Sequence, residues 1–270
     1  MRLKDKVAVI LGAAGRDNMG QMIARRFAEE GARVVVAGRK QPALEKLAGE
    51  LHGEHVVCDI TRKADVEALA ATTARTCGRI DIAVNCTGWA PLSRLLETSE
   101  EELEQLSALQ FKGTYFFLQA MVRAMAEAGG GSIIQMTSAS VHALLYNHAG
   151  YIATKAAGEA LVRCFANEFG ARGVKVNCIA PGLTASPMTE KEMSLPGLNE
   201  VFVKEYPLGR IGTTADIANA ALWLATAESF VTGQVLQVNG GLTLRRNPSA
   251  KEISASLRAA SANAGRGSTQ

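Results

Sequence analysis

Three side chains that can hold or transfer a proton lie close together in the sequence. Tyr151 and Lys155 are four residues apart in a segment with helical periodicity, so a helix would place both on one face. A phenol with a pKa near ~10 is a poor acid at neutral pH, but a neighbouring ammonium lowers that pKa. Ser138 ends the preceding predicted strand, where its hydroxyl could hold a substrate oxygen. The set suits proton transfer to a carbonyl oxygen while a cofactor delivers hydride, although a lone Tyr-x-x-x-Lys usually marks a solvated helix face.

A glycine-rich loop directly after the first predicted strand supplies a candidate cofactor site. Glycines at a strand-to-helix turn let the backbone approach a pyrophosphate, and the helix N-terminus supplies N–H groups. The loop lacks a Gly-x-Gly-x-x-Gly pattern and is unusually long, and any tight turn can use glycines. Asn18 is in position to cap the helix. The cofactor-binding residues predicted in this loop are Gly12, Gly15, Arg16, Asn18, Met19 and Gly20.

The end of the second predicted strand indicates which nicotinamide cofactor is bound. An acidic residue there would bind the ribose 2′-hydroxyl of NAD, whereas an arginine accommodates the 2′-phosphate of NADP. Residues 37 to 40 include no acid, and Arg39 is well placed for the phosphate, with Arg16 as a second candidate. These residues favour NADP(H) over NAD(H). The alternative is that both arginines are solvated surface charges.

The elements that must position these residues follow the pattern of a parallel sheet covered by helices. Short apolar runs predict strands at 7–11, 34–37, 56–58, 80–85, 132–137, 174–179 and 235–238. Helical periodicity separates them at 18–30, 42–51, 64–77, 100–128, 151–169 and 214–224. We therefore expect a single α/β domain, with a Rossmann-type doubly wound parallel sheet of about seven strands and helices on both faces.

Length and charge bound the domain organisation. The chain of 270 residues fits one domain over residues 1–244, with no internal repeat. The formal net charge is +3, but residues 245–270 hold five basic residues against Glu252. The body is therefore close to neutral, which argues against a nucleic-acid partner. Residues 245–270 predict a flexible basic tail, with at most one weak helical turn around Ile253 and Leu257.

The cysteines and the apolar stretches exclude other classes of protein. The five cysteines are odd in number and lack metal-ligand spacing, so we expect no metal site and a reducing cytoplasm. The first predicted strand begins at once, which leaves no room for a signal peptide. Residues 128–154 carry no Asp, Glu, Lys or Arg, but glycines and polar residues interrupt them. They predict no membrane span.

Further short motifs follow in an order that resembles the short-chain dehydrogenase/reductase family, in its single-domain branch. Ser138, thirteen residues before Tyr151, stands where that family keeps its catalytic serine, and residues 151–155 match its Tyr-x-x-x-Lys. Asn85-Cys86-Thr87-Gly88 resembles its Asn-Asn-Ala-Gly stretch, with the second and third residues changed. The other matching segments are 177–182, with a Pro-Gly turn, 207–210, 232–234 and 239–241. The resemblance covers about residues 6 to 242.

This resemblance implies roles for individual residues. Tyr151 would be the acid/base, Lys155 would lower its pKa and bind the nicotinamide ribose, and Ser138 would hold the substrate oxygen. Asp59-Ile60 resembles the family's adenine contact, although Asp59 could instead cap a helix. The other cofactor contacts implied are Asn85, Gly88, Pro181, Gly182, Thr184 and Ser186. The family also implies a homotetramer or homodimer, joined partly through the helices near 100–128 and 151–169.

The sequence departs from the family pattern at two places. The glycine loop is about two residues longer than Thr-Gly-x-x-x-Gly-x-Gly, and Leu11 replaces the Thr; its length is closer to the enoyl-ACP reductases. Those relatives place their tyrosine seven residues before the lysine, where this chain has His148, which disfavours enoyl reduction. Gln110 stands where the family usually has Asn in a water chain that delivers protons to the lysine. Gln carries the same amide group as Asn on a longer side chain. We therefore include Gln110 among the catalytic residues, and whether its amide reaches the water chain stays an open question.

Several apolar and aromatic residues are placed to shape a substrate pocket. Residues 183–206, with an apolar stripe that includes Met188, Met193 and Phe202, predict a mobile lid, although the same stripe could mark helix packing. Trp89, His142, Leu144, Tyr146 and His148 surround the predicted active-site edge. Both histidines could equally be packed and neutral.

Together these residues predict an NADP(H)-dependent oxidoreductase that interconverts a ketone and a secondary alcohol. The small-molecule substrate is either a 3-oxoacyl-ACP or a small to medium hydrophobic ketone or cyclic alcohol, and no basic patch for an acidic carrier is evident. The alternative is a catalytically silent NADP-binding sensor or scaffold. Retention of Ser138, Tyr151 and Lys155 together argues against that alternative.

Overall fold

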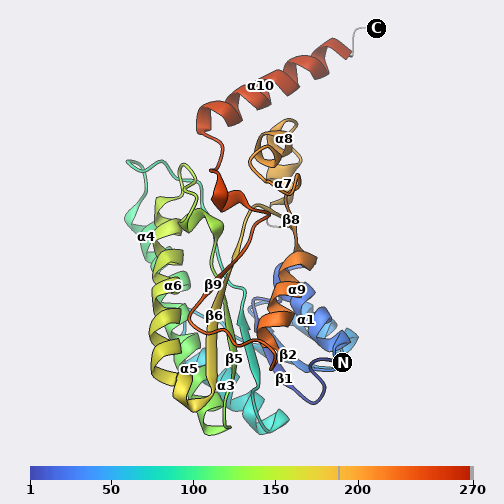
Figure 1. Cartoon of the computed structure of the whole chain (residues 1–270), viewed down its shortest axis with the longest axis vertical. Helices are drawn as coiled ribbons and strands as arrows, with labels where there is room; N and C mark the ends of the chain where they lie inside the picture. The colour runs from blue at the N-terminus through green and yellow to red at the C-terminus, as the bar shows by residue number, and fades with distance from the viewer. Residues whose placement is uncertain (188, 268–270) are drawn as a thin grey trace.

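The sheet organises the whole molecule. A computed structural model describes residues 1–187 and 189–267, and its main sheet has seven parallel strands in the order β3-β2-β1-β4-β5-β6-β9 (Figure 1). The strands are β1 (Val7–Leu11), β2 (Arg33–Gly38), β3 (Glu54–Val57), β4 (Ile82–Asn85), β5 (Gly131–Met136), β6 (Val174–Pro181) and β9 (Val235–Val238). Strand order runs outward from β1 in both directions, so the prediction of a Rossmann-type doubly wound sheet is confirmed.

Helices cover both faces of the sheet, as Figure 1 shows. One face carries α1 (Met19–Glu29), α2 (Gln41–Glu50) and α9 (Thr214–Ala225), and the other carries α3 (Lys63–Cys77), α5 (Gly113–Glu127) and α6 (Ala149–Phe169). Along β1, Val7, Val9 and Leu11 pack into one core, while Ala8 and Ile10 pack into the other. A strand buried on both sides needs apolar residues at every position, which explains the continuous apolar runs in the sequence.

The long helix predicted over 100–128 is two helices joined by a π-helical turn. α4 (Glu100–Leu106) begins at Ser99, whose Oγ accepts a hydrogen bond from the N–H of Glu102. Residues Ser107–Lys112 form the π-helical turn and α5 follows. Such turns widen the helix locally and are frequent at functional sites. Here the turn contains Gln110, whose side chain is buried.

The segment predicted as a lid contains three short elements. They are β7 (Thr184–Ala185), α7 (Glu190–Met193) and α8 (Leu198–Val203). β7 pairs with β8 (Gly212–Thr213) in a two-stranded sheet that the sequence analysis did not predict. Leu198, Val201 and Phe202 are buried in one apolar cluster, so the stripe does pack as a helix face. Met188 lies outside the described residues, and mobility of the lid stays a prediction.

The expected single weak turn near the C-terminal end is instead the helix α10 (Ala250–Gly267). Ser249 and Glu252 form reciprocal contacts at its start: Glu252 Oε2 accepts from the Ser249 N–H at 2.7 Å, and Ser249 Oγ accepts from the Glu252 N–H at 3.3 Å. Ile253 and Leu257 pack against the buried residues of α8. The local sequence did not indicate the full length of this helix, because its apolar partner lies about 55 residues away in the chain.

Candidate active site

Ser138, Tyr151 and Lys155 meet at the carboxyl edge of the sheet. Ser138 follows β5 and caps the 3₁₀ turn η2 (Ala139–Val141), while the other two lie on the first turns of α6. All three line one cavity of about 220 Å³. In an open α/β sheet, ligands bind at this edge because loops and helix ends converge there.

Lys155 is buried and directed towards the backbone. Its Nζ donates to the carbonyl oxygens of Met136 at 2.9 Å and Thr87 at 3.4 Å, and lies 5.8 Å from the centre of the Tyr151 ring. Burial disfavours the ammonium and lowers the pKa of Lys155 to about 8. The lysine is therefore charged at neutral pH but lies close to its titration range.

The sequence led us to expect a lowered pKa for Tyr151, but the structure indicates a raised one. Burial raises the pKa of Tyr151, and the Ser138 hydroxyl acts in the opposite direction. The physical reason is that the Lys155 ammonium points to backbone carbonyls while the phenol loses its hydration. Tyr151 is consequently a protonated phenol at neutral pH, which is the form that can donate a proton to a ketone.

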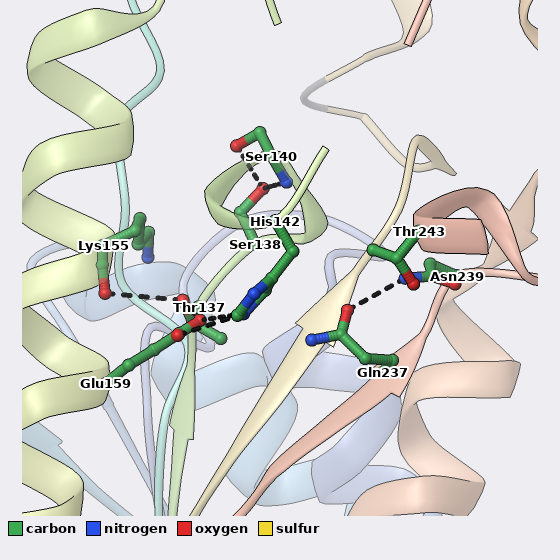
Figure 2. Close-up of polar contacts among 9 residues, drawn as sticks. All are labelled: Thr137, Ser138, Ser140, His142, Lys155, Glu159, Gln237, Asn239 and Thr243. Atoms are coloured by element: carbon green, nitrogen blue, oxygen red, sulfur yellow. Dashed lines mark hydrogen bonds and ion pairs between the residues drawn. The ribbon is translucent and has the colours of Figure 1, made fainter. Parts of the chain in front are cut away.

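The Ser138 hydroxyl is held by its own turn. Its Oγ accepts from the Ser140 N–H at 3.2 Å and lies 2.8 Å from Ser140 Oγ, as Figure 2 shows. These contacts fix the position of the Ser138 oxygen beside α6. Ser138 is therefore placed before any substrate arrives.

Gln110 lies beside Lys155 but forms no hydrogen bond with it. Its Oε1 accepts from the Trp89 N–H at 3.2 Å, and its Nε2 donates to Thr154 Oγ1 at 2.8 Å. Gly88 stands between them, since a Cβ there would lie 3.3 Å from both Gln110 Oε1 and Lys155 Nζ. The amide thus ties the loop after β4 to α6, and its participation in a proton relay stays a prediction.

The glycine loop folds back on the start of α1. Asn18 caps the helix as predicted: its Oδ1 accepts from the Gln21 N–H at 2.9 Å, while its Nδ2 donates to the carbonyl of Gly12 at 2.8 Å. Gly12 has a φ of +97°, and a Cβ there would lie 2.9 Å from the carbonyl carbon of Cys86. A Cβ on Gly20 would lie 2.8 Å from the Gly12 oxygen, and one on Gly15 would lie 2.8 Å from Asn18 Nδ2. At Gly12 and Gly20 the neighbouring atoms belong to the backbone, so only glycine fits there.

The two arginines proposed for a 2′-phosphate lie in different places. Arg39 is exposed at the end of β2, next to Gly38, which packs closely on Ala14. Arg16 is also exposed, pairs with Asp17 at 3.2 Å and faces a second cavity of about 540 Å³. The lid residues that line this second cavity are Ala185, Ser186, Pro187, Glu190, Met193 and Ser194. Of the two, Arg39 has the position that the sequence analysis requires.

Asp59 forms a local turn with Thr61. Its Oδ1 accepts from the Thr61 N–H at 3.0 Å and from Thr61 Oγ1 at 2.8 Å. Partial burial opposes ionisation, but these hydrogen bonds and the charges of Arg39 and Arg62 outweigh it and lower the pKa of Asp59. Asp59 is thus a carboxylate close to Arg39. Ile60 is buried in the core and does not line the described cavities.

The remaining predicted cofactor residues divide into two groups. Met19, Gly88, Pro181, Gly182, Thr184 and Ser186 line the same cavity as the catalytic set. Asn85 does not, because its side chain crosslinks the sheet: Nδ2 donates to Gln135 Oε1 at 2.9 Å, and Oδ1 accepts from the Thr87 N–H at 3.0 Å. It shapes the loop that carries Gly88. Asn239 has a comparable structural role, donating to Gln237 and Thr243 in the turn drawn in Figure 2.

Part of the cavity wall consists of residues that the sequence did not indicate. Asn247, from the predicted tail, lines the cavity, and its Nδ2 donates to the carbonyl of Ala143 at 2.5 Å. Leu242 and Leu145 also line it, together with the expected Trp89 and His148. No local pattern marks Asn247, because its partner lies 104 residues away.

Comparison with known proteins establishes the family. A family model described as Enoyl-(Acyl carrier protein) reductase matches residues 12–243. Galactitol 2-dehydrogenase (L-tagatose-forming) of Cereibacter sphaeroides is 37% identical over 253 residues, which cover 90% of this chain and 97% of the relative. D-threitol dehydrogenase of Mycolicibacterium smegmatis is 34% identical, with coverages of 90% and 95%.

The chain belongs to the short-chain dehydrogenase/reductase family. It is an oxidoreductase that acts on alcohol and ketone groups. A solved short-chain dehydrogenase/reductase from Mycobacterium ulcerans superposes with a TM-score of 0.89 at 27% identity, covering 96% of this chain and 99% of that one. A gluconate 5-dehydrogenase from Burkholderia cenocepacia, solved with NADP and tartrate, gives a TM-score of 0.86 at 30% identity, with coverages of 90% and 97%.

Two features are absent from the part of this short-chain dehydrogenase/reductase that the structure describes. No helix among those residues is long and apolar enough to cross a membrane. No group of three or more His, Cys, Asp or Glu side chains is arranged there to hold a metal ion. The five cysteines are free thiols.

Proposed function

We propose that this enzyme interconverts a ketone and a secondary alcohol with NADP(H), using Tyr151 as the acid/base. The observation that carries the proposal is the convergence of Ser138, Tyr151 and Lys155 on one cavity. Met19, from the helix that follows the glycine loop, lines the same cavity. A dinucleotide on that loop would therefore reach the substrate where a proton donor is already in place.

The residues present fit a nicotinamide dinucleotide. Close backbone approach at Gly12 and Gly20 leaves no room for a Cβ, a Cβ on Gly88 would crowd the side chains of Gln110 and Lys155, and the N-terminus of α1 offers N–H groups to a pyrophosphate. When bound, the nicotinamide supplies or accepts a hydride. We propose that it is held by Gly12, Gly15, Arg16, Asn18, Met19, Gly20, Arg39, Asp59, Gly88, Tyr151, Lys155, Pro181, Gly182, Thr184 and Ser186, with Asn85 and the buried Ile60 acting through the loops they shape.

The three side chains divide the proton chemistry between them. In reduction, Tyr151 Oη gives its proton to the ketone oxygen while Ser138 Oγ donates a hydrogen bond to the same oxygen. The phenolate that remains is stabilised by the Lys155 ammonium. In oxidation, the phenolate takes the hydroxyl proton back, so the same three residues serve both directions.

The cavity walls support a substrate with an apolar body. Trp89, Leu145, Leu183, Phe202 and Leu242 line the cavity. These side chains favour a ketone or cyclic alcohol with a hydrophobic body, while Ser140, His148 and Thr189 in the same wall offer partners to a few polar groups. The body of the chain is close to neutral, which gives no support to an acidic carrier protein.

A screen of ketones with both cofactors tests this proposal. Cyclohexanone, L-tagatose and acetoacetyl-CoA are each offered with NADPH and with NADH, and cofactor absorbance is followed. We expect the highest kcat/KM for cyclohexanone with NADPH. A preference for L-tagatose would contradict the proposed apolar substrate class but not the proposed reaction. Absence of turnover with every ketone, together with NADPH binding, would favour the silent sensor or scaffold.

We also propose a homodimer or homotetramer in a reducing cytoplasm. Large apolar side chains are exposed along the segment that includes α4, the π-helical turn and the start of α5, namely Leu103, Phe111 and Tyr115. Large exposed apolar side chains of this kind are covered in many oligomers. Sedimentation of the purified chain tests the assembly.

A further inference from the structure

A buried carboxylate joins the catalytic helix to both ends of the Ser138 turn. Glu159 lies one helical turn after Lys155 on α6, and its side chain is 9% exposed. Its Oε1 accepts from Thr137 Oγ1 at 2.9 Å, and its Oε2 lies 3.1 Å from His142 Nε2. Figure 2 shows these residues between the turn and α6.

The partners of Glu159 flank Ser138 in the sequence. Thr137 precedes it by one residue, and His142 ends the 3₁₀ turn that Ser138 begins. A buried carboxylate is costly unless hydrogen bonds satisfy it, so these contacts are strongly favoured once the chain has folded. Thr137 Oγ1 also lies 3.5 Å from the carbonyl oxygen of Lys155. The turn is thereby attached to α6 on both sides of Ser138.

The attachment bears on catalysis because the reacting groups lie on the two joined elements. Tyr151 and Lys155 move with α6, whereas Ser138 moves with the turn. Proton donation and hydrogen bonding to one substrate oxygen require a fixed separation between Tyr151 and Ser138, and a displacement of about 1 Å can cost roughly 10²-fold in rate. Within the described residues, the hydrogen-bond partners of the Ser138 side chain are Ser140 and Tyr151.

We propose that His142 and Glu159 are positioning residues that hold Ser138 at its working distance from Tyr151. Neither side chain lines the substrate cavity, so both act through the turn. The inference rests on the proposed role of Ser138 in substrate binding.

A double-mutant cycle on the full-length chain tests the inference. Ser138→Ala, His142→Ala and the double variant are compared for kcat and KM with cyclohexanone, or with the best ketone of the screen. We expect kcat to fall about tenfold in His142→Ala, with little change in the dissociation constant of NADPH. In the double variant, kcat should equal that of Ser138→Ala alone, because nothing remains for His142 to position.

Further variants separate positioning from general stability. His142→Gln keeps a hydrogen-bond donor and should recover most of kcat, while Thr137→Val removes the other contact to Glu159 and should lower kcat. His55 is a matched control, since it pairs with Glu45 at 3.7 Å far from the site and is similarly half-exposed. His55→Ala should leave kcat unchanged. Thermal melting of each variant identifies any that fail to fold.

Two outcomes would overturn the inference in different ways. If Ser138→Ala lowers kcat but His142→Ala does not, or if their effects multiply in the double variant, positioning by His142 is wrong and the proposed function stands. If Ser138→Ala itself leaves kcat unchanged, the role proposed for Ser138 fails and the inference fails with it.

Discussion

The cofactor side and the substrate side of the cavity are built differently. On the cofactor side, the glycine loop takes its shape from contacts within a few residues, such as Asn18 with Gly12 and Gln21, and the loop after β4 is anchored to the sheet and to α6 through Asn85 and Gln110. On the substrate side, the wall combines Leu145, Phe202 and Asn247, which come from distant segments. We infer that the cofactor side is rigid and generic, whereas the substrate side can change without disturbing the sheet.

The largest expected effect lies where the two sides meet. Tyr151→Phe keeps the ring and removes the transferable proton, so kcat should fall on the order of 10²-fold or more while NADPH affinity stays within a few-fold. Steady-state kinetics and a fluorescence titration of NADPH measure the two quantities. A variant that kept more than a tenth of wild-type kcat would show that Tyr151 is not the acid/base.

A change on the cofactor side should alter cofactor choice alone. A guanidinium meets a 2′-phosphate with charge-assisted hydrogen bonds, which are worth roughly 10- to 100-fold in affinity. The unmodified protein should therefore bind NADPH more tightly than NADH, and Arg39→Asp should reverse the preference. Titration of both cofactors at low salt decides the question. Tighter binding of NADH by the unmodified protein would leave Arg39 as a surface charge.

The pH dependence of reduction tests the shared lysine. Because the pKa of Lys155 is lowered to about 8, its ammonium is lost as the pH rises through that value. Above it, kcat/KM for ketone reduction should fall about tenfold per pH unit, since the phenolate of Tyr151 loses its stabilising charge. Lys155→Arg keeps a positive charge at all these pH values, so its kcat/KM should not fall above pH 8, whatever the absolute activity of the variant. A wild-type profile that stays flat to pH 9.5 would contradict the assignment.

The smallest effect is expected on the substrate side. Asn247→Ala removes a polar group from the cavity wall and the hydrogen bond to Ala143, so KM for the ketone should rise a few-fold with NADPH affinity unchanged. Asn219→Ala serves as the control, because Asn219 is exposed on α9 and accepts one hydrogen bond, from Arg26 Nε at 3.2 Å, outside the cavity wall. If Asn247→Ala changed the NADPH affinity as much as the KM for the ketone, the two sides of the cavity would not be independent.

The sequence predicted what depends on local pattern. Short continuous apolar runs, separated by helical segments, located all seven strands of the main sheet. The Tyr-x-x-x-Lys spacing placed Tyr151 and Lys155 on one helix, as the structure confirms. The features that escaped prediction depend on contacts between distant segments. The π-helical turn around Gln110, the helix α10 and the contact of Asn247 with Ala143 all belong to this class. The direction of the Tyr151 pKa shift was also wrong, because burial cannot be read from spacing.

The burial of Lys155 has a consequence for the stability of the native state. Lowering its pKa from 10.5 to about 8 corresponds to about 3 kcal/mol against folding at neutral pH, because the unfolded chain binds the proton more readily. This unfavourable contribution is fully present below pH 8 and disappears as the pH rises towards 10.5, so stability from this group increases with pH in that window. A buried apolar side chain at 155 would avoid the cost and abolish the ammonium. Activity and stability therefore make opposite demands on one side chain.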